Sequence, residues 1–172
     1  MAAFRTLPMT LLLVSAGFLH AADWHVGPTS LKIEEIQKIQ AGEGLEKAWR
    51  AVEFPKAFFL TLDEKASDNV PDAPADVLQE VSRLVQDRAK KADGEALSLT
   101  VRVTTWKTSL VPVSTRATAG VEVVVRRKDG TLLFAGFESF KSKNSDFGSF
   151  SDSDAKIIGG KVFAGIRKAL SF

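Results

Sequence analysis

The sequence VEVVVRRKDGTLLFAGFESF, Val121 to Phe140, holds two apolar segments on either side of an Asp-Gly pair. Asp-Gly between two such segments is the strongest short-range signal for a β-hairpin, because both residues readily take the backbone angles of its tight turn. The stretch therefore predicts two antiparallel strands, Gly120 to Arg127 and Thr131 to Phe140, joined at Asp129-Gly130.

A third strand is predicted directly before this hairpin. Leu97, Leu99, Val101 and Val103 alternate with polar residues. Strict alternation is typical of a strand with one buried face. We place this strand at Ala96 to Trp106, so that three consecutive strands form an antiparallel meander.

A short strand and an amphipathic helix are predicted ahead of the meander. KAFFLTL, Lys56 to Leu62, is an apolar run bounded by a proline and a polar stretch, which is typical of a strand. Between Asp72 and Gly94, apolar residues recur on one helical face, and Gly94 is expected to end that helix in a left-handed conformation. The apolar residues are Val77, Leu78, Val81, Leu84 and Val85.

The last predicted element is a helix that follows Ser151. Ser151 and Asp154 have the spacing of a capping box. The face expected to be buried consists of Ile158, Val162, Ile166 and Leu170. Gly159, Gly160 and Gly165 keep one side of this helix thin, which we interpret as close approach to the sheet; a surface for a partner helix is the alternative.

Two short helices are predicted near the N-terminus. The first begins at Leu31 and carries isoleucines at roughly helical spacing. The second covers Leu45 to Val52, where a strand near Val52 is the alternative. With the other elements, these predict an α+β fold: two layers, an antiparallel sheet of about four strands with helices on one face, in the order β-α-β-β-β-α after a helical N-terminal extension.

The first residues have the pattern of an export signal. Arg5 precedes an uncharged apolar run, Leu7 to Leu19, that ends in small residues, as secretory signal peptides do. The run is shorter than the roughly 20 residues of a membrane-spanning helix. We expect cleavage after Ala21, with Ala22 as the alternative, and a single domain at 22–172; a buried N-terminal helix of the folded domain is the other interpretation.

The composition limits the cell compartment and the class of partner that we expect. The chain has no cysteine, so we expect neither disulfides nor the lipid anchor that bacterial lipoproteins carry on a cysteine. The mature chain should be periplasmic or secreted and should lack a transmembrane segment. Loss of Arg5 with the signal lowers the net charge from +2 to +1, a balance that argues against a nucleic-acid partner.

The usual catalytic and metal-binding motifs are missing from the sequence. Removal of the signal takes His20 and leaves only His25, too few for a zinc site. GGKV, Gly159 to Val162, lacks the hydroxyl residue of a phosphate-binding loop. NSDFGSFSDSD, Asn144 to Asp154, lacks the ligand spacing of a calcium loop. We therefore expect no catalytic residues, no cofactor and no metal.

Two predicted connections carry apolar residues that a polar loop would not need. Leu110, Val111 and Val113 follow the first strand of the meander, and Phe147 and Phe150 follow its last strand. Alternate strands of a meander end at the same edge of the sheet, so both connections should lie side by side. We predict one contact patch from these five residues; packing back onto the core is the alternative.

From about Trp49 to Leu170, the order of these segments resembles a group of small bacterial cell-envelope proteins of unknown function, most of them outer-membrane lipoproteins. The resemblance is carried by KAFFLTL, DVLQEVSRLVQ, LSLTVRVTTW, SLVPVSTRATAG, VEVVVRRKDGTLLFAGFESF and SDAKIIGGKVFAGIRKAL. It implies a periplasmic accessory or structural role and assigns no functional residue. This chain lacks the lipid-attachment cysteine of the group.

The function expected from the sequence is that of an exported, non-catalytic cell-envelope protein that binds another protein or an envelope polymer. The alternative is a periplasmic hydrolase that uses carboxylates. The scarcity of histidine and the absence of cysteine favour the binding protein.

Overall fold

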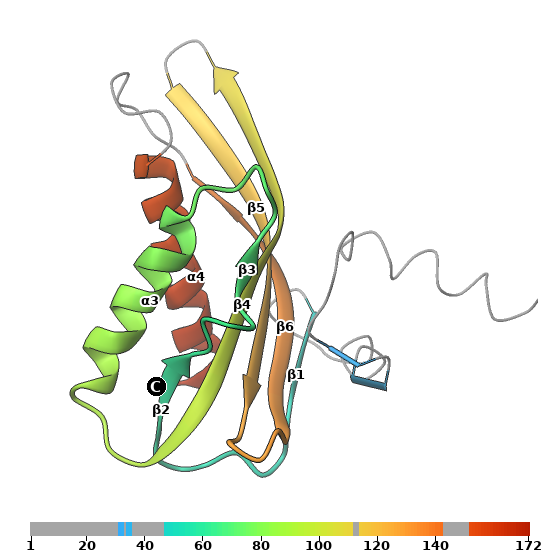
Figure 1. The fold of residues 1–172 in the computed structure, drawn as a ribbon, viewed down its shortest axis with the longest axis vertical. Coiled ribbons are helices and arrows are strands. Elements are labelled where there is room, and N and C mark those ends of the chain that lie inside the picture. The colour runs from blue at the N-terminus through green and yellow to red at the C-terminus, as the bar shows by residue number, and fades with distance from the viewer. Residues whose placement is uncertain (1–30, 33, 36–46, 112–113, 143–151) are drawn as a thin grey trace, which may run out of the picture.

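The computed structural model describes residues 31–32, 34–35, 47–111, 114–142 and 152–172, and its described part is a sheet with two helices on one face (Figure 1). The strands are β1 (Lys47–Arg50), β2 (Phe58–Leu62), β3 (Asp68–Asn69), β4 (Glu95–Val111), β5 (Ser114–Arg126) and β6 (Leu132–Lys141). The helices are α3 (Asp76–Ala89) and α4 (Asp152–Leu170). The predicted α+β class and its two layers are confirmed.

The sheet has the strand order β1-β6-β5-β4-β2, with β3 also paired to β4. Strands β4, β5 and β6 form the predicted antiparallel meander. The sheet is not purely antiparallel, however, because β2 and β3 run parallel to β4. The physical reason is α3, which carries the chain back along the sheet before β4 begins, as a crossover between parallel strands requires.

The second N-terminal helix was wrongly predicted. Lys47–Arg50 is strand β1, paired antiparallel with β6 from Phe137 to Phe134. Periodicity over so short a segment does not separate a helix from a strand. The segment forms a strand because the edge of β6 provides hydrogen-bond partners for its backbone. Of the first predicted helix, Glu34 and Glu35 are helical; the rest of it, and the export signal, lie outside the described residues.

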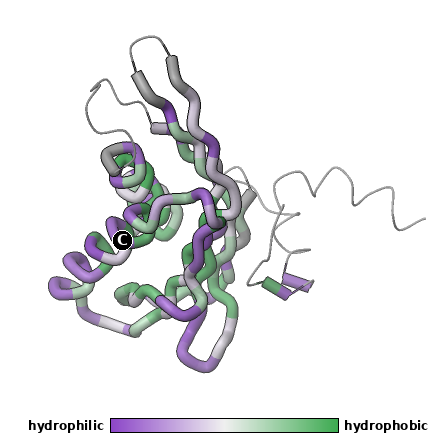
Figure 2. Tube along the Cα trace, turned by 45° about the horizontal axis from the view of Figure 1, so that its top comes forward, coloured by the Kyte–Doolittle hydropathy of each residue, from purple (hydrophilic) through white to green (hydrophobic). Residues whose placement is uncertain are grey.

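The core lies between the sheet and the two helices. Val77, Val81 and Val85 of α3 are buried there, as predicted. The predicted face of α4 is buried as well, and Ile158, Ile166 and Leu170 are its largest fully buried side chains. Figure 2 shows that the hydrophilic residues of α3 lie mostly on its side away from the sheet.

Two of the three glycines in α4 mark close approaches. A Cβ on Gly165 would lie 3.3 Å from side-chain atoms of Glu138 and Phe140 in β6, which confirms the predicted approach to the sheet. A Cβ on Gly159 would lie 2.7 Å from the carbonyl oxygen of Val77, so this glycine admits α3 rather than the sheet. A Cβ on Gly160 would meet nothing within 4 Å.

Gly94 and Gly130 both have positive φ, at 119° and 89°. Gly130 closes the β5–β6 hairpin as predicted. In that hairpin the amide of Arg127 donates to the carbonyl of Thr131 at 2.9 Å. The prediction that Gly94 ends the helix is wrong, because α3 ends at Ala89 with Lys90 as its C-cap, and Gly94 instead precedes β4 after a short turn. No helix in the described part of the chain is long and apolar enough to cross a bilayer.

Candidate functional site

Strands β4 and β5 extend well beyond their neighbours in the sheet. The last pairing of β3 with β4 is at Val103, and the last pairing of β6 with β5 joins Lys141 to Thr118. Past these points, the described strands pair only with each other. Figure 1 shows this hairpin projecting beyond the ends of both helices. We call residues Thr105–Val111 and Ser114–Arg116 the β4–β5 arm.

In the arm, both strands extend past their predicted ends. The residues between the predicted strands that end at Trp106 and begin at Gly120 were expected to be a connection, yet β4 continues to Val111 and β5 begins at Ser114. Serine and threonine residues recur through this segment. Threonine is β-branched and suits an exposed strand, so the same residues are compatible with a two-stranded ribbon.

Of the five predicted contact residues, the structure describes two, and both lie at the end of the arm. Leu110 and Val111 are the last residues of β4, opposite Thr115 and Ser114. Val113, Phe147 and Phe150 lie outside the described residues. Because β4 and β6 both pair antiparallel with β5, they do end toward the same edge of the sheet. The joint contact patch itself stays a prediction.

Three basic residues share one face where the arm meets the sheet. Lys107 and Lys141 are both paired with Thr118 in register, and Arg116 lies two positions from Thr118 on β5. Residues two apart on a strand, and residues directly opposite one another, face the same side of a sheet. All three are exposed, and the ion pairs found among the described residues include none of them.

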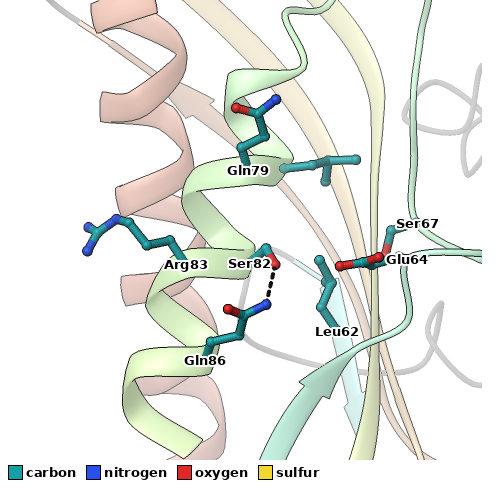
Figure 3. Close-up of a pocket in the computed structure, with 8 residues that line it drawn as sticks. Leu62, Glu64, Ser67, Gln79, Ser82, Arg83 and Gln86 are labelled. Atoms are coloured by element: carbon teal, nitrogen blue, oxygen red, sulfur yellow. Dashed lines mark hydrogen bonds between the residues drawn. The ribbon is translucent and has the colours of Figure 1, made fainter.

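A groove lies between α3 and the turn that follows β2. Its volume is about 390 Å³, within the range of small-molecule sites. One wall is formed by Leu78, Ser82 and Gln86, which follow one another at four-residue spacing along α3. The opposite wall carries Glu64 and Ser67 (Figure 3).

The turn wall is tied to β4 by hydrogen bonds. The amide of Asp63 donates to the carbonyl of Leu99 at 2.7 Å, and the Ser67 hydroxyl accepts a hydrogen bond from the amide of Val101 at 3.1 Å. Within the turn, the amide of Ser67 donates to the carbonyl of Asp63 at 2.9 Å. These bonds hold the backbone around Glu64 at a fixed position relative to the sheet.

We call Leu62, together with Leu78 at one end of the α3 wall, the apolar floor of the groove; the other lining residues are polar or charged. Leu62 and Leu78 are half-buried in it. The Gln86 side-chain amide donates to the Ser82 hydroxyl oxygen at 3.2 Å, and the exposed Glu64 carboxylate points across the groove toward α3 (Figure 3). Such a surface can hold an aliphatic chain below and a polar group beside Glu64.

The other charge at the groove is directed away from it. The Arg83 side chain points out of the groove in Figure 3, and its guanidinium donates to Glu80 at 2.7 and 2.9 Å and to Asp87 at 3.2 Å. The hydrogen bond from Arg83 lowers the pKa of Glu80. The charge that faces the groove is therefore the negative one of Glu64.

This groove was not predicted from the sequence. Ser82 and Gln86 are visible as a polar pair on α3, but their partners across the groove come from a different segment. What brings the walls together is the parallel pairing of β2 with β4, and that pairing was not predicted. Among the described residues, no group of three or more His, Cys, Asp or Glu side chains is arranged to hold a metal ion.

Comparisons with known proteins give only distant similarity. No protein-family model matches the chain, and no curated protein matches its sequence. A minor lipoprotein from Acinetobacter baumannii aligns with 66% of this chain and 89% of its own, at 12% identity and a TM-score of 0.38. A lipoprotein from Neisseria meningitidis aligns with 67% of this chain and 99% of its own, at 16% identity and a TM-score of 0.33. We transfer no residue and no activity from either structure.

Proposed function

We propose that this chain is an exported, non-catalytic protein of the bacterial cell envelope that binds a partner through its β4–β5 arm. The export signal, Leu7 to Leu19 with cleavage after Ala21, supports the location. The mature chain is then a periplasmic or secreted binding domain, and its partner is another envelope protein or an envelope polymer.

The observation that carries this proposal is that no described strand pairs with the outer edges of the arm. An isolated two-stranded ribbon is marginally stable in water. Its outer edges expose unpaired backbone N–H and C=O groups, which proteins normally cover or blunt. An added strand from another protein satisfies such an edge, which is a common mode of peptide recognition. Of the two classes of partner, the arm therefore favours a protein.

The alternative function, a hydrolase that uses carboxylates, finds less support. Glycoside hydrolysis of the usual kind needs two carboxyl groups on either side of the bond that breaks. The described lining of the groove contributes Glu64 as its one carboxylate. We therefore keep the binding function as the proposal.

Site-specific photocrosslinking in the periplasm tests the proposal. A photoreactive amino acid replaces Ser109, which is exposed on the arm, or Lys128, which is exposed at the hairpin at the other end of the sheet. We expect a crosslinked partner protein from position 109 and not from position 128. N-terminal sequencing of the same purified protein should begin at Ala22.

Two results would contradict the proposal. Equal crosslinking from both positions would mean that the arm has no special role in association. Absence of any crosslinked species at position 109, in cells where the variant is exported and folded, would remove the arm as a binding surface.

A further inference from the structure

We propose that the groove between α3 and the Asp63–Ser67 turn binds a primary ammonium group carried on an aliphatic chain. This site is separate from the β4–β5 arm, so the inference goes beyond the proposed function. Lysine side chains and free aliphatic diamines both present this chemistry. The argument rests on the shape of the groove, its apolar floor and the sign of the charge that faces it.

The shape suits a slender ligand. Leu78, Ser82 and Gln86 extend along two turns of α3, which corresponds to about 12 Å. A groove of this length has room for an extended alkyl chain of several methylenes with its terminal group. Because the turn wall is hydrogen-bonded to β4 through Asp63 and Ser67, the groove exists before the ligand enters it. A preformed site loses less free energy to ordering when it binds.

The floor provides contact for methylene groups. Leu62 and Leu78 line the groove and are half-buried, so part of each residue stays in contact with solvent. A bound alkyl chain removes this apolar surface from water, which favours association. A ligand that consisted of a charged group without a carbon chain would leave the floor uncovered.

The polar side of the groove provides acceptors for an ammonium group. In Figure 3 the Glu64 carboxylate points toward α3, and Ser82 lies on the helix across from it. An ammonium has three N–H donors and no acceptor, so a carboxylate together with hydroxyl oxygens satisfies it. Hydrogen bonds in which both partners are charged are the stronger ones.

The same arrangement disfavours an anion. Arg83, the cation on the groove wall, points away from it and is already bonded to Glu80 and Asp87. An anionic ligand would lie beside Glu64 with no described cation turned toward it, and like charges at this distance repel. The groove therefore selects for positive charge.

NMR titration of the mature protein tests the site. The probes are Nα-acetyl-lysine amide, its norleucine counterpart, which has the same carbon chain without the ammonium, and the free diamine cadaverine. We expect saturable shifts of the Leu62 and Ser82 amide signals with the lysine probe. The norleucine probe should bind about fivefold more weakly, which corresponds to the loss of one exposed charge pair. Tighter binding of cadaverine than of the lysine probe would identify free diamines as the source.

Glu64→Gln supplies the decisive variant and Glu53→Gln its control. Glu53 is an exposed carboxylate outside the groove, so its variant should bind as the wild type does. Glu64→Gln keeps the size of the side chain and should abolish the preference for the lysine probe over norleucine. The proposal is wrong if norleucine binds as tightly as lysine, if Glu64→Gln with a native spectrum keeps the preference, or if no probe gives saturable shifts.

Discussion

Arg126 and Glu35 form a two-pronged ion pair between the sheet and the segment before β1. The Nη1 atom lies 2.7 Å from Oε1 and the Nη2 atom 2.8 Å from Oε2. Both side chains are largely shielded from solvent. Beside them, Leu31 is buried in a small apolar cluster with Val124, Leu132 and Ala135 on the sheet face opposite the helices. The pair and the cluster together attach this segment to that face.

Removing either partner of this pair should destabilise the fold. We expect Glu35→Gln to lower the free energy of unfolding by about 1.5–3 kcal/mol, the range for hydrogen bonds to charged groups. A double-mutant cycle with Arg126→Ala isolates the interaction between the two side chains. Chemical denaturation gives the free energy of unfolding of the wild type, the two single variants and the double variant. Glu34→Gln, which changes an exposed carboxylate one position away, should be neutral; an equal loss there would mean that local helix effects, not the pair, cause the change.

The same pair predicts a pH dependence. The hydrogen bond from Arg126 is the largest cause that lowers the pKa of Glu35, from 4.5 to about 2. A carboxyl group with a lowered pKa in the folded state contributes stability above its unfolded pKa and loses it as the pH falls toward the folded one. The stability difference between wild type and Glu35→Gln should therefore be constant above about pH 5 and should shrink between about pH 4.5 and 2. A difference that stayed constant down to pH 2 would contradict the assigned cause.

Local signals predicted the meander and the helices because each of these elements is specified by its own residues. Asp129-Gly130 forms the turn between β5 and β6, and the alternation of Leu97 to Val103 gives β4 its buried face. Strand β1 was missed because Lys47–Arg50 gains its hydrogen bonds from β6, far away in the sequence. The parallel pairing of β2 with β4 also depends on distant residues, so no local sequence pattern predicts it.

The candidate sites, like the fold, were predicted where nearby residues specify them and missed where they depend on distant segments. The apolar residues Leu110 and Val111 stood out in the sequence and do end β4. The arm itself was not predicted: the segment between the two strands was predicted to be a connection, although its threonines suit an exposed strand. Glu64 was one of many surface carboxylates in the sequence, and only the packing of α3 beside the β2–β3 turn distinguishes it.

The glycines of α4 offer a matched pair of substitutions. Gly159→Ala would place a Cβ 2.7 Å from the Val77 carbonyl oxygen, so α3 and α4 must move apart. Gly160→Ala meets no atom within 4 Å and replaces a poor helix former by the best one. We expect Gly160→Ala to stabilise the fold by about 0.5–1 kcal/mol and Gly159→Ala to destabilise it by about 1–3 kcal/mol. Thermal or chemical unfolding measures both, and a stabilising Gly159→Ala would contradict the close approach of the helices.

The basic face at the base of the arm predicts how charge affects association, given the proposed function. Lys107 and Arg116 are exposed and lie on one face of the ribbon. Exposed charges at the rim of an interface act mainly on the association rate, and salt screens them. Reversing both, in Lys107→Glu with Arg116→Glu, should slow association with the crosslinked partner about tenfold at low salt. Unfolding stability should stay within about 0.5 kcal/mol of wild type, because surface substitutions of this kind have small effects.

Reversal of two exposed lysines away from the arm, Lys56→Glu with Lys128→Glu, is the control for this experiment. It changes the net charge of the protein by the same amount and leaves the arm intact. If the arm is the docking surface, the control should associate nearly as fast as the wild type, and the defect of the arm variant should diminish as salt is added. An equal defect in both variants would mean that overall charge governs association, and an unimpaired arm variant would mean that the partner contacts another surface.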